Sequence, residues 1–309
     1  MPNLYSHREE NIWKTWVFLG FFSVLVLGFG WFLAFFYANA YIFVFAVLLA
    51  IFGNFFSYWY ADKLVLKLHK AHPVTREEYF DLWNATENLS ITAGLPMPKL
   101  YIIEDASPNA FATGRDKDHA VICVTTGLLK ILNKNELEGV LAHELSHIGN
   151  NDMLLSTIVV VLGGFVALLS NFFLRSGSFR GRDRNDNNGL IMIVGVVLAI
   201  LAPLAATLIR LAISRQREFL ADASGALLTR YPEGLASALQ KISQSGEPLK
   251  SANDATAHLF IANPFGNNKE GSLHKLFLTH PPVAERIHAL IDVKDDSSRT
   301  RQGRTSEAS

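Results

Sequence analysis

Four long apolar runs constrain this chain more than any other feature of its sequence. Residues 16–38 and 41–60 form a first pair, and residues 154–174 and 190–213 form a second. About 20 apolar residues are enough for a helix to cross the hydrocarbon core of a bilayer. Half of the chain is hydrophobic and only 18% is charged, as expected for a membrane protein with a soluble part. We therefore predict a membrane-embedded, mainly α-helical protein with four hydrophobic membrane segments.

The first pair predicts a tight transmembrane hairpin at the start of the chain, within residues 1–60. The run 16–38 is too long for a removable signal peptide and lacks the small-residue cleavage pattern of one. The run 41–60 carries aromatic residues at both ends, where the two membrane interfaces would lie. Lysines directly after a span mark the cytoplasmic side, and three follow here: Lys63, Lys67 and Lys70.

The second pair leaves two arrangements open. Four arginines lie in the loop 175–184 between its runs, against seven basic residues beside the spans on the opposite side. By the positive-inside rule, the majority favours that opposite side as cytoplasmic. The pair, residues 154–213, either crosses the bilayer or enters it partway as a hairpin packed against the protein. In both arrangements the chain from residue 217 onward lies on the same side as His143.

Between the two pairs, residues 140–149 read Val-Leu-Ala-His-Glu-Leu-Ser-His-Ile-Gly. His143 and His147 are four residues apart, so on a helix they share one face and can reach one ion. Zinc takes neutral imidazole nitrogens in tetrahedral geometry and in catalytic sites keeps one position open for water. Glu144 lies about 100° further round the same turn, where its carboxylate can take a proton from that water. This is the H-E-x-x-H arrangement of zinc peptidases.

The surroundings of this motif predict a buried helix. Asn133 and Glu136 have the spacing of a helix N-cap and its capping-box partner. The apolar residues of the following segment fit one buried stripe: Leu137, Val140, Leu141, Leu145 and Ile148. Upstream, the same reasoning predicts a helical stretch at 75–93 and three strand candidates, at 99–103, 107–114 and 120–124.

A second chemical motif follows the second apolar pair. Glu218 and Asp222 are four residues apart in a helical pattern, so the two carboxylates share a face. A catalytic zinc with two histidines needs a third protein ligand, and a carboxylate from another helix completes such a set. Asp222, one turn further on, can accept a hydrogen bond from the other ring nitrogen of a ligand histidine. The catalytic domain is thus predicted in two parts, 61–153 and 214–293, followed by a disordered tail at 294–309.

These pieces together resemble the HtpX-type membrane zinc endopeptidases, which are relatives of the CAAX prenyl proteases. The likeness rests on residues 143–147 with Asn150 and Asp152 after them, on residues 217–222, and on Thr279-His-Pro-Pro282. It implies a gluzincin-like zinc metalloprotease domain with a short mixed sheet and an active-site helix. It also places the protein in a bacterial inner membrane with the catalytic domain facing the cytoplasm.

The resemblance assigns roles residue by residue. It implies one catalytic Zn²⁺ held by His143, His147 and Glu218, with Glu144 as general base and Asp222 supporting the ligands. It implies His280 as a donor to the transition state and Arg286 as a helper that orients the site. The family's substrate-binding sheet edge matches residues 107–114, where an extended peptide can add as a strand. The residues expected to bind substrate are Asn109, Ala110, Phe111 and Ala112.

A substrate bound through its backbone is cleaved with loose sequence specificity. This favours degradation of misfolded or damaged membrane proteins, the quality-control role that the resemblance also implies. The expected partners are polypeptide substrates, which we expect to be membrane proteins, and the lipid bilayer; the formal net charge of zero gives no case for nucleic acid. Two alternatives stay open: a CAAX-type processing peptidase, and a non-catalytic membrane scaffold with structural zinc. The single cysteine, Cys123, excludes an internal disulfide.

Overall fold

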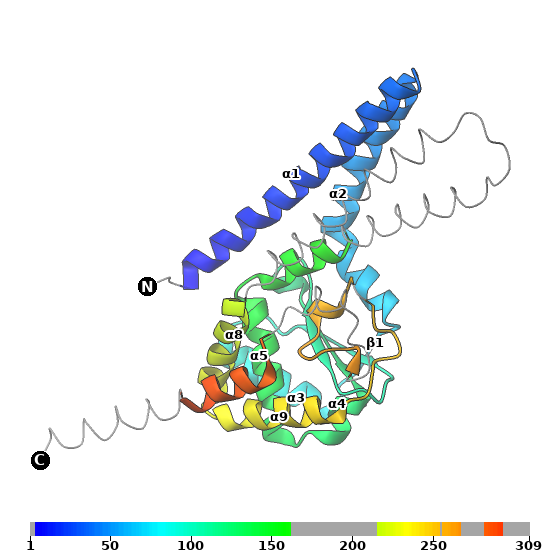
Figure 1. The fold of residues 1–309 in the computed structure, drawn as a ribbon. Helices are drawn as coiled ribbons and strands as arrows, with labels where there is room; N and C mark the ends of the chain where they lie inside the picture. The colour runs from blue at the N-terminus through cyan, green and yellow to red at the C-terminus, as the bar shows by residue number, and fades with distance from the viewer. Residues whose placement is uncertain (1–3, 162–214, 254, 267–280, 293–309) are drawn as a thin grey trace, which may run out of the picture.

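The structure is a computed structural model that describes residues 4–161, 215–253, 255–266 and 281–292. Within these ranges the chain is mainly helical, with one small mixed sheet. Two long helices, α1 (Leu4–Phe36) and α2 (Ala40–Leu68), form an antiparallel hairpin that projects from the rest of the molecule (Figure 1). Residues 37–39 make the turn between them, and the Asn39 side chain accepts a hydrogen bond from the Tyr41 N–H to cap α2.

The outer surface of this hairpin is apolar and exposed. Trp16, Trp31, Phe35 and Tyr41 each have more than 60% of their surface accessible. Soluble monomers rarely expose so much contiguous apolar surface. Both helices are long and apolar enough to cross a membrane, as the runs 16–38 and 41–60 predict.

The second helix of the hairpin extends beyond the predicted run 41–60. It continues to Leu68, and its last turns enter the part of the molecule that holds the predicted catalytic domain, hereafter the catalytic part, where Val65 and Leu66 are buried. These residues pack on the sheet and on the segment around Phe260. The hairpin is therefore continuous with the core of the catalytic part.

The sheet has four strands in the order β1-β2-β4-β3. The strands are β1 (His72–Pro73), β2 (Lys99–Ile103), β3 (Ala110–Thr113) and β4 (Val121–Thr125). β2 and β4 run parallel, while β1 and β3 are antiparallel to their neighbours. The predicted strand at 99–103 is confirmed. The candidates at 107–114 and 120–124 also form strands, but the first is shorter than predicted and the second begins and ends one residue later.

The described residues also contain a set of shorter helices. The bounds are α3 (Phe80–Ala93), η1 (Lys117–His119), α4 (Thr126–Ile131), α5 (Lys134–Gly149), a helix at Asp152–Val161, α8 (Arg215–Thr229), α9 (Pro232–Ser245), η2 (Ala257–Leu259) and a helix at 283–292. The predicted helical stretch at 75–93 begins only at Phe80. The residues before it form a turn in which Glu78 accepts a hydrogen bond from the Thr75 N–H.

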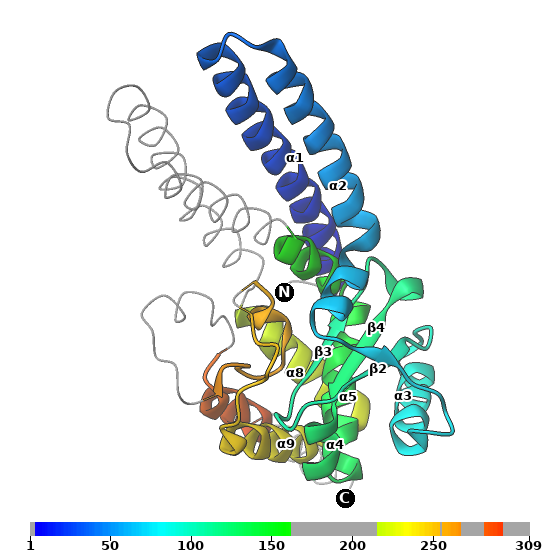
Figure 2. The same ribbon diagram turned by 90° about the vertical axis from the view of Figure 1, so that its right-hand side faces the viewer.

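Helix α5 is the centre of the catalytic part. It starts with the predicted capping box, in which Asn133 and Glu136 each bond to the other's backbone. The helix contacts β3 and the helices α3, α8 and α9, with α3 on one side of it and α8 and α9 on the other (Figure 2), and its stripe of apolar residues joins the main core. Gly225 of α8 allows α8 to cross close by, since a Cβ there would lie 3.0 Å from the backbone nitrogen of His143. This crossing brings Glu218 towards the histidines.

The second apolar pair is described only at its start. The helix Asp152–Val161 covers the beginning of the run 154–174, and it packs on α1 through Leu155, Ile158 and Val159. The rest of the pair lies outside the described residues, as do His280 and the tail at 294–309.

Candidate metal centre

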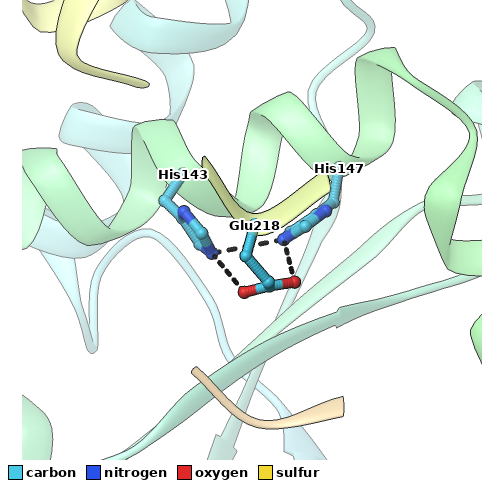
Figure 3. Close-up of side chains that lie close together, drawn as sticks. All are labelled: His143, His147 and Glu218. Carbon is cyan, nitrogen blue, oxygen red and sulfur yellow. Dashed lines mark hydrogen bonds and ion pairs between the residues drawn. The ribbon is translucent and has the colours of Figure 1, made fainter. Parts of the chain in front are cut away.

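His143, His147 and Glu218 converge on one point. The two histidines lie one turn apart on α5, and Glu218 approaches from the first turn of α8 (Figure 3). The Nε2 atoms of the histidines are 3.2 Å apart, and the Glu218 carboxylate oxygens lie 3.9 Å from His143 Nε2 and 3.7 Å from His147 Nε2. All three residues can offer one ligand atom to the same ion.

The separations fit a tetrahedral zinc ion. Two nitrogens bound at about 2.0–2.1 Å with tetrahedral angles lie roughly 3.3–3.4 Å apart, close to the separation of the two Nε2 atoms. Each histidine turns its other nitrogen, Nδ1, towards an aspartate. Because Nδ1 then carries the proton, both Nε2 lone pairs face the same point, an arrangement that a cation stabilises. The donor set of two imidazoles and one carboxylate is that of catalytic zinc sites.

The support for His143 comes from within the catalytic part. Asp222 lies one turn after Glu218 on α8, and its Oδ1 is 2.9 Å from His143 Nδ1. Arg286, from the helix 283–292, donates two hydrogen bonds to the Asp222 carboxylate, at 2.8 and 2.6 Å, and a third to the Ile261 carbonyl. Burial raises the pKa of Asp222, but the bonds to Arg286 outweigh it and the pKa is lowered overall. Asp222 therefore stays a charged acceptor for His143.

The support for His147 comes partly from the hairpin. Asp152 Oδ2 lies 3.0 Å from His147 Nδ1, and Asn11 of α1 donates to the other oxygen, Oδ1, at 2.6 Å. Arg217 approaches the same oxygen at 3.7 Å. Burial lowers the pKa of His147, but the hydrogen bond to Asp152 and the neighbouring carboxylates outweigh it and raise the pKa to about 9. The site therefore attracts positive charge, in the form of a proton or a metal ion.

Glu144 faces the same cavity as the three ligand candidates. It is buried on α5, and the cavity is lined by Glu144 and the ligands together with Ala112, Met153 and Ile261. A carboxylate beside the ligands can take a proton from a water molecule that occupies the cavity. His258 also lines the cavity, and its Nε2 lies 3.1 Å from the Ser156 carbonyl.

The strand β3 is an edge of the described sheet, but part of its outer side is occupied. The Ala110 carbonyl accepts a hydrogen bond from the Ile261 N–H at 2.9 Å. The Asn109 side chain bonds to both the N–H and the C=O of Ala262. Phe111 is fully buried between His69 and Phe260. Of the four residues expected to bind substrate, only Ala112 lines the cavity.

The structure thus brings together most of the residues that the sequence singles out, and it adds others. Asp152 appears in the sequence argument only as part of a motif, and Arg217 only as part of a motif and as a basic residue beside a span. Asn11 and His258 were missed. An amide just before a long apolar run was the available signal for Asn11; nothing in the spacing of His258 distinguishes it from the other histidines.

Two histidines one turn apart, a glutamate beside the first and a carboxylate from a second helix define a class of protein: the metallopeptidases of the H-E-x-x-H type. The comparisons with known proteins agree. The sequence model of peptidase family M48 matches residues 77–294. The chain therefore belongs to peptidase family M48, and it is a metalloprotease.

Individual relatives show which members of this family the chain resembles. The "Protease HtpX homolog" of Thermoanaerobacter pseudethanolicus is 48% identical over 294 residues, which cover 93% of this chain and 97% of that protein. The "Protease HtpX homolog" of Dictyoglomus turgidum is 52% identical over 229 residues, 74% of each chain. The crystal structure of S. mikatae Ste24p aligns over 81% of this chain and 57% of that one, with 22% identity and a TM-score of 0.47. The resemblance to HtpX-type proteases is confirmed.

Proposed function

We propose that this protein is a membrane-bound, zinc-dependent endopeptidase that cleaves misfolded or damaged membrane proteins with loose sequence specificity. The observation that carries the proposal is the convergence of His143, His147 and Glu218 in a cavity that Glu144 also lines. A scaffold with structural zinc would need a fourth protein ligand. Among the described residues, the group that could hold a metal contains these three.

Zinc, when bound, polarises the scissile carbonyl and makes a water molecule more acidic, with a pKa of roughly 7. The chain supplies the remaining chemistry. Glu144 takes the proton of the attacking water and returns it to the leaving amine, a role worth about 10²–10⁴ in rate. Asp222 and Asp152 hold the ligand histidines in one tautomer. His280, which lies outside the described residues, is the proposed donor to the developing oxyanion.

Substrate binding is proposed at the free part of the β3 edge. Asn109 accepts from the Thr125 N–H through its carbonyl, so its backbone faces β4, whereas the Ala110 carbonyl faces outward to Ile261. Because backbone groups alternate along a strand, those of Ala112 also face outward, beside the ligands. We propose that an extended peptide pairs with Ala112. The Asn109 side chain and the Ala110 carbonyl already bond to Ala262 and Ile261 of the protein itself.

The position of the site supports a membrane location for the substrates. Asn11, which touches the support of His147, lies five residues before the apolar run 16–38, about 8 Å along the axis of α1. The helix Asp152–Val161, which starts at the same place, contains the first residues of the second apolar pair. We propose four membrane segments, a gluzincin-like catalytic domain, and an orientation facing the cytoplasm in a bacterial inner membrane. Segments of membrane proteins next to the bilayer would then reach the centre directly.

The test is cleavage of an unfolded reporter such as casein by detergent-purified protein, with zinc content measured on every sample. Glu144→Gln is expected to keep zinc and to lower the cleavage rate about 10²–10⁴-fold, because it keeps the shape of the side chain but cannot take a proton. Glu138→Gln, on the same helix, is the matched control and should cleave like the unmodified protein. A chelator should abolish cleavage, and added zinc should restore it.

Two results would count against the proposal. If Glu144→Gln keeps its zinc and cleaves at the unmodified rate, the assignment of the base is wrong. If the protein binds zinc but cleaves neither casein nor membrane-protein substrates, the scaffold alternative replaces the peptidase.

A further inference from the structure

We propose that Asn11, on the first helix of the hairpin, is a positioning residue for the metal centre and holds the His147 side of it in place. The proposal rests on the zinc centre proposed above and extends it to a residue that lies outside the catalytic part. In this proposal the hairpin anchors the protein and also helps to hold a metal ligand in position.

The Asn11 side chain is buried and hydrogen-bonded. Only 3% of its surface is accessible, although it lies near the start of a long exposed helix. Its Nδ2 donates to Asp152 Oδ1 at 2.6 Å and to the Asn150 carbonyl at 3.3 Å. Its Oδ1 accepts from Arg217 at 3.5 Å. One amide therefore contacts both chain segments that carry metal ligands, at the end of α5 and at the start of α8.

The contact with Asn150 falls at a sharp bend of the chain. Asn150 is the C-cap of α5, and Asn151 has a φ of 58°, in the left-handed region. The next helix begins at Asp152. A non-glycine residue in this conformation needs support from its surroundings. By binding the Asn150 carbonyl and the Asp152 carboxylate together, Asn11 fixes the bend that aims Asp152 at His147.

The chemistry of the contacts explains an amide at this position. Asp152 presents one oxygen to His147 and the other to Asn11, so each oxygen has its own partner. Arg217, 3.7 Å from the second oxygen, would compete for the carboxylate if it were not also held by the Asn11 oxygen. An amide side chain can donate to the aspartate through its NH₂ group and accept from the arginine through its oxygen at once. A carboxylate would repel Asp152, and an apolar side chain would leave both partners without this bond.

The expected consequence is a dependence of zinc affinity on Asn11. Losing a direct outer partner of a metal ligand costs about 10–100-fold in affinity. Asn11 acts through Asp152, so we expect Asn11→Leu to raise the zinc dissociation constant about tenfold, at the lower end of that range. Leucine suits an apolar helix, so insertion into the membrane is retained. Cobalt(II) in the same site should show a changed visible spectrum, which reports the ligand geometry around the ion.

The matched control is Asn54→Leu. Asn54 is a second amide in the same hairpin, on α2, but its Nδ2 donates to Ser23 of α1 at 2.7 Å and not to the metal side. The same substitution there removes a polar contact of the hairpin and should change the zinc dissociation constant less than twofold. Affinities are measured on the full chain in detergent by competition with a chelating indicator, so the readout does not need peptidase activity.

Each outcome decides the proposal. A weaker affinity in Asn11→Leu alone, with a changed cobalt spectrum, supports it. An unchanged affinity in Asn11→Leu, or an equal loss in Asn54→Leu, overturns it. If Asn11→Leu fails to insert, Asn11→Asp is judged by the same criterion, because its carboxylate can accept from Arg217 but cannot donate to Asp152. A failure of the unmodified protein to bind zinc would instead overturn the proposed function.

Discussion

The two ligand histidines stand four residues apart on one helix, yet they are supported by different regions of the molecule. His143 turns to Asp222, which Arg286 holds with two hydrogen bonds deep in the catalytic part. His147 turns to Asp152, which is held by Asn11 of the hairpin, with Arg217 nearby. Each aspartate faces the Nδ1 atom of its histidine and orients the ring. The first is fixed by a buried ion pair, and the second by the amide of a helix that is long enough to cross a membrane.

The two kinds of support affect different properties. The ion pair mainly affects the stability of the fold, and the amide mainly affects the position of the metal ligand. A buried, bidentate arginine–aspartate pair is strongly coupled to folding, because removing either partner leaves an uncompensated charge inside the protein. A neutral amide leaves no such charge when it is lost, so its removal mainly loosens the geometry. We therefore expect the His143 side to fail by unfolding, and the His147 side to fail by losing metal while the fold remains.

Arg286→Ala tests the His143 side and should have the largest effect. Arg286 has no accessible surface, and its substitution removes the arginine cation that neutralises the buried Asp222 carboxylate. We expect a loss of roughly 3–5 kcal/mol in the free energy of unfolding. Urea or thermal unfolding in detergent, followed by circular dichroism, measures it. Arg286→Lys should restore little, since lysine cannot make the two parallel bonds.

The proposed difference between the two histidines would be wrong if Arg286→Ala unfolded at the same denaturant concentration as the unmodified protein but lost its metal. In that case the pair would serve placement and not stability, and the two sides would be alike.

Asp152→Ala tests the His147 side and should have an intermediate effect. It removes the acceptor of His147 Nδ1, so we expect zinc to bind about 10–100-fold more weakly. The fold should lose less stability than in Arg286→Ala, because Asp152 lies next to Arg217 and a hydrogen-bonding amide and not within a bidentate pair. Chelator competition and unfolding on the same preparation give both numbers. A stability loss as large as that of Arg286→Ala would contradict the distinction.

Local pattern predicted much of this fold and its centre. The capping box at Asn133, the apolar stripe of α5 and the one-turn spacing of His143 and His147 are encoded within one short segment, and these elements form as predicted. The strand at 99–103 and the two membrane-length helices follow from local hydrophobicity in the same way. Periodicity and capping act over a few residues, so a sequence shows them directly.

Contacts between distant segments were not predictable in this way. Asn11 meets Asp152 across 141 residues, and Asn109 meets Ala262 across 153. The segment that contains Ala262 also changes the prediction for the substrate edge, because the neighbouring Ile261 N–H binds the outward carbonyl of Ala110. The helix α2 extends past the predicted apolar run 41–60 for a related reason: its last turns are stabilised by packing on the sheet, which the run of apolar residues does not reveal.

A pH effect at His69 should be the smallest of these effects, and it tests the hairpin from its other helix. His69 follows α2, and its ring nitrogens lie 2.9 Å from the Ser251 hydroxyl and 3.0 Å from the Thr256 hydroxyl. Burial lowers the pKa of His69 from 6.5 to about 4. The unfolded chain therefore binds the proton more readily than the folded one. The stability that the neutral ring contributes is fully present above pH 6.5 and is lost as the pH falls towards 4.

Between pH 7 and pH 5.5 the free energy of unfolding should fall by about 1 kcal/mol through this group. His69→Gln removes the titration, so the difference between the two proteins at the two pH values isolates it from other groups. Equal pH slopes would show that His69 is not held neutral. The pH slopes of the unmodified protein and His69→Gln could differ while their zinc dissociation constants at pH 7 are the same. In that case a change at the end of α2 does not affect metal binding. Placement of His147 would in that case depend on α1 alone, through Asn11.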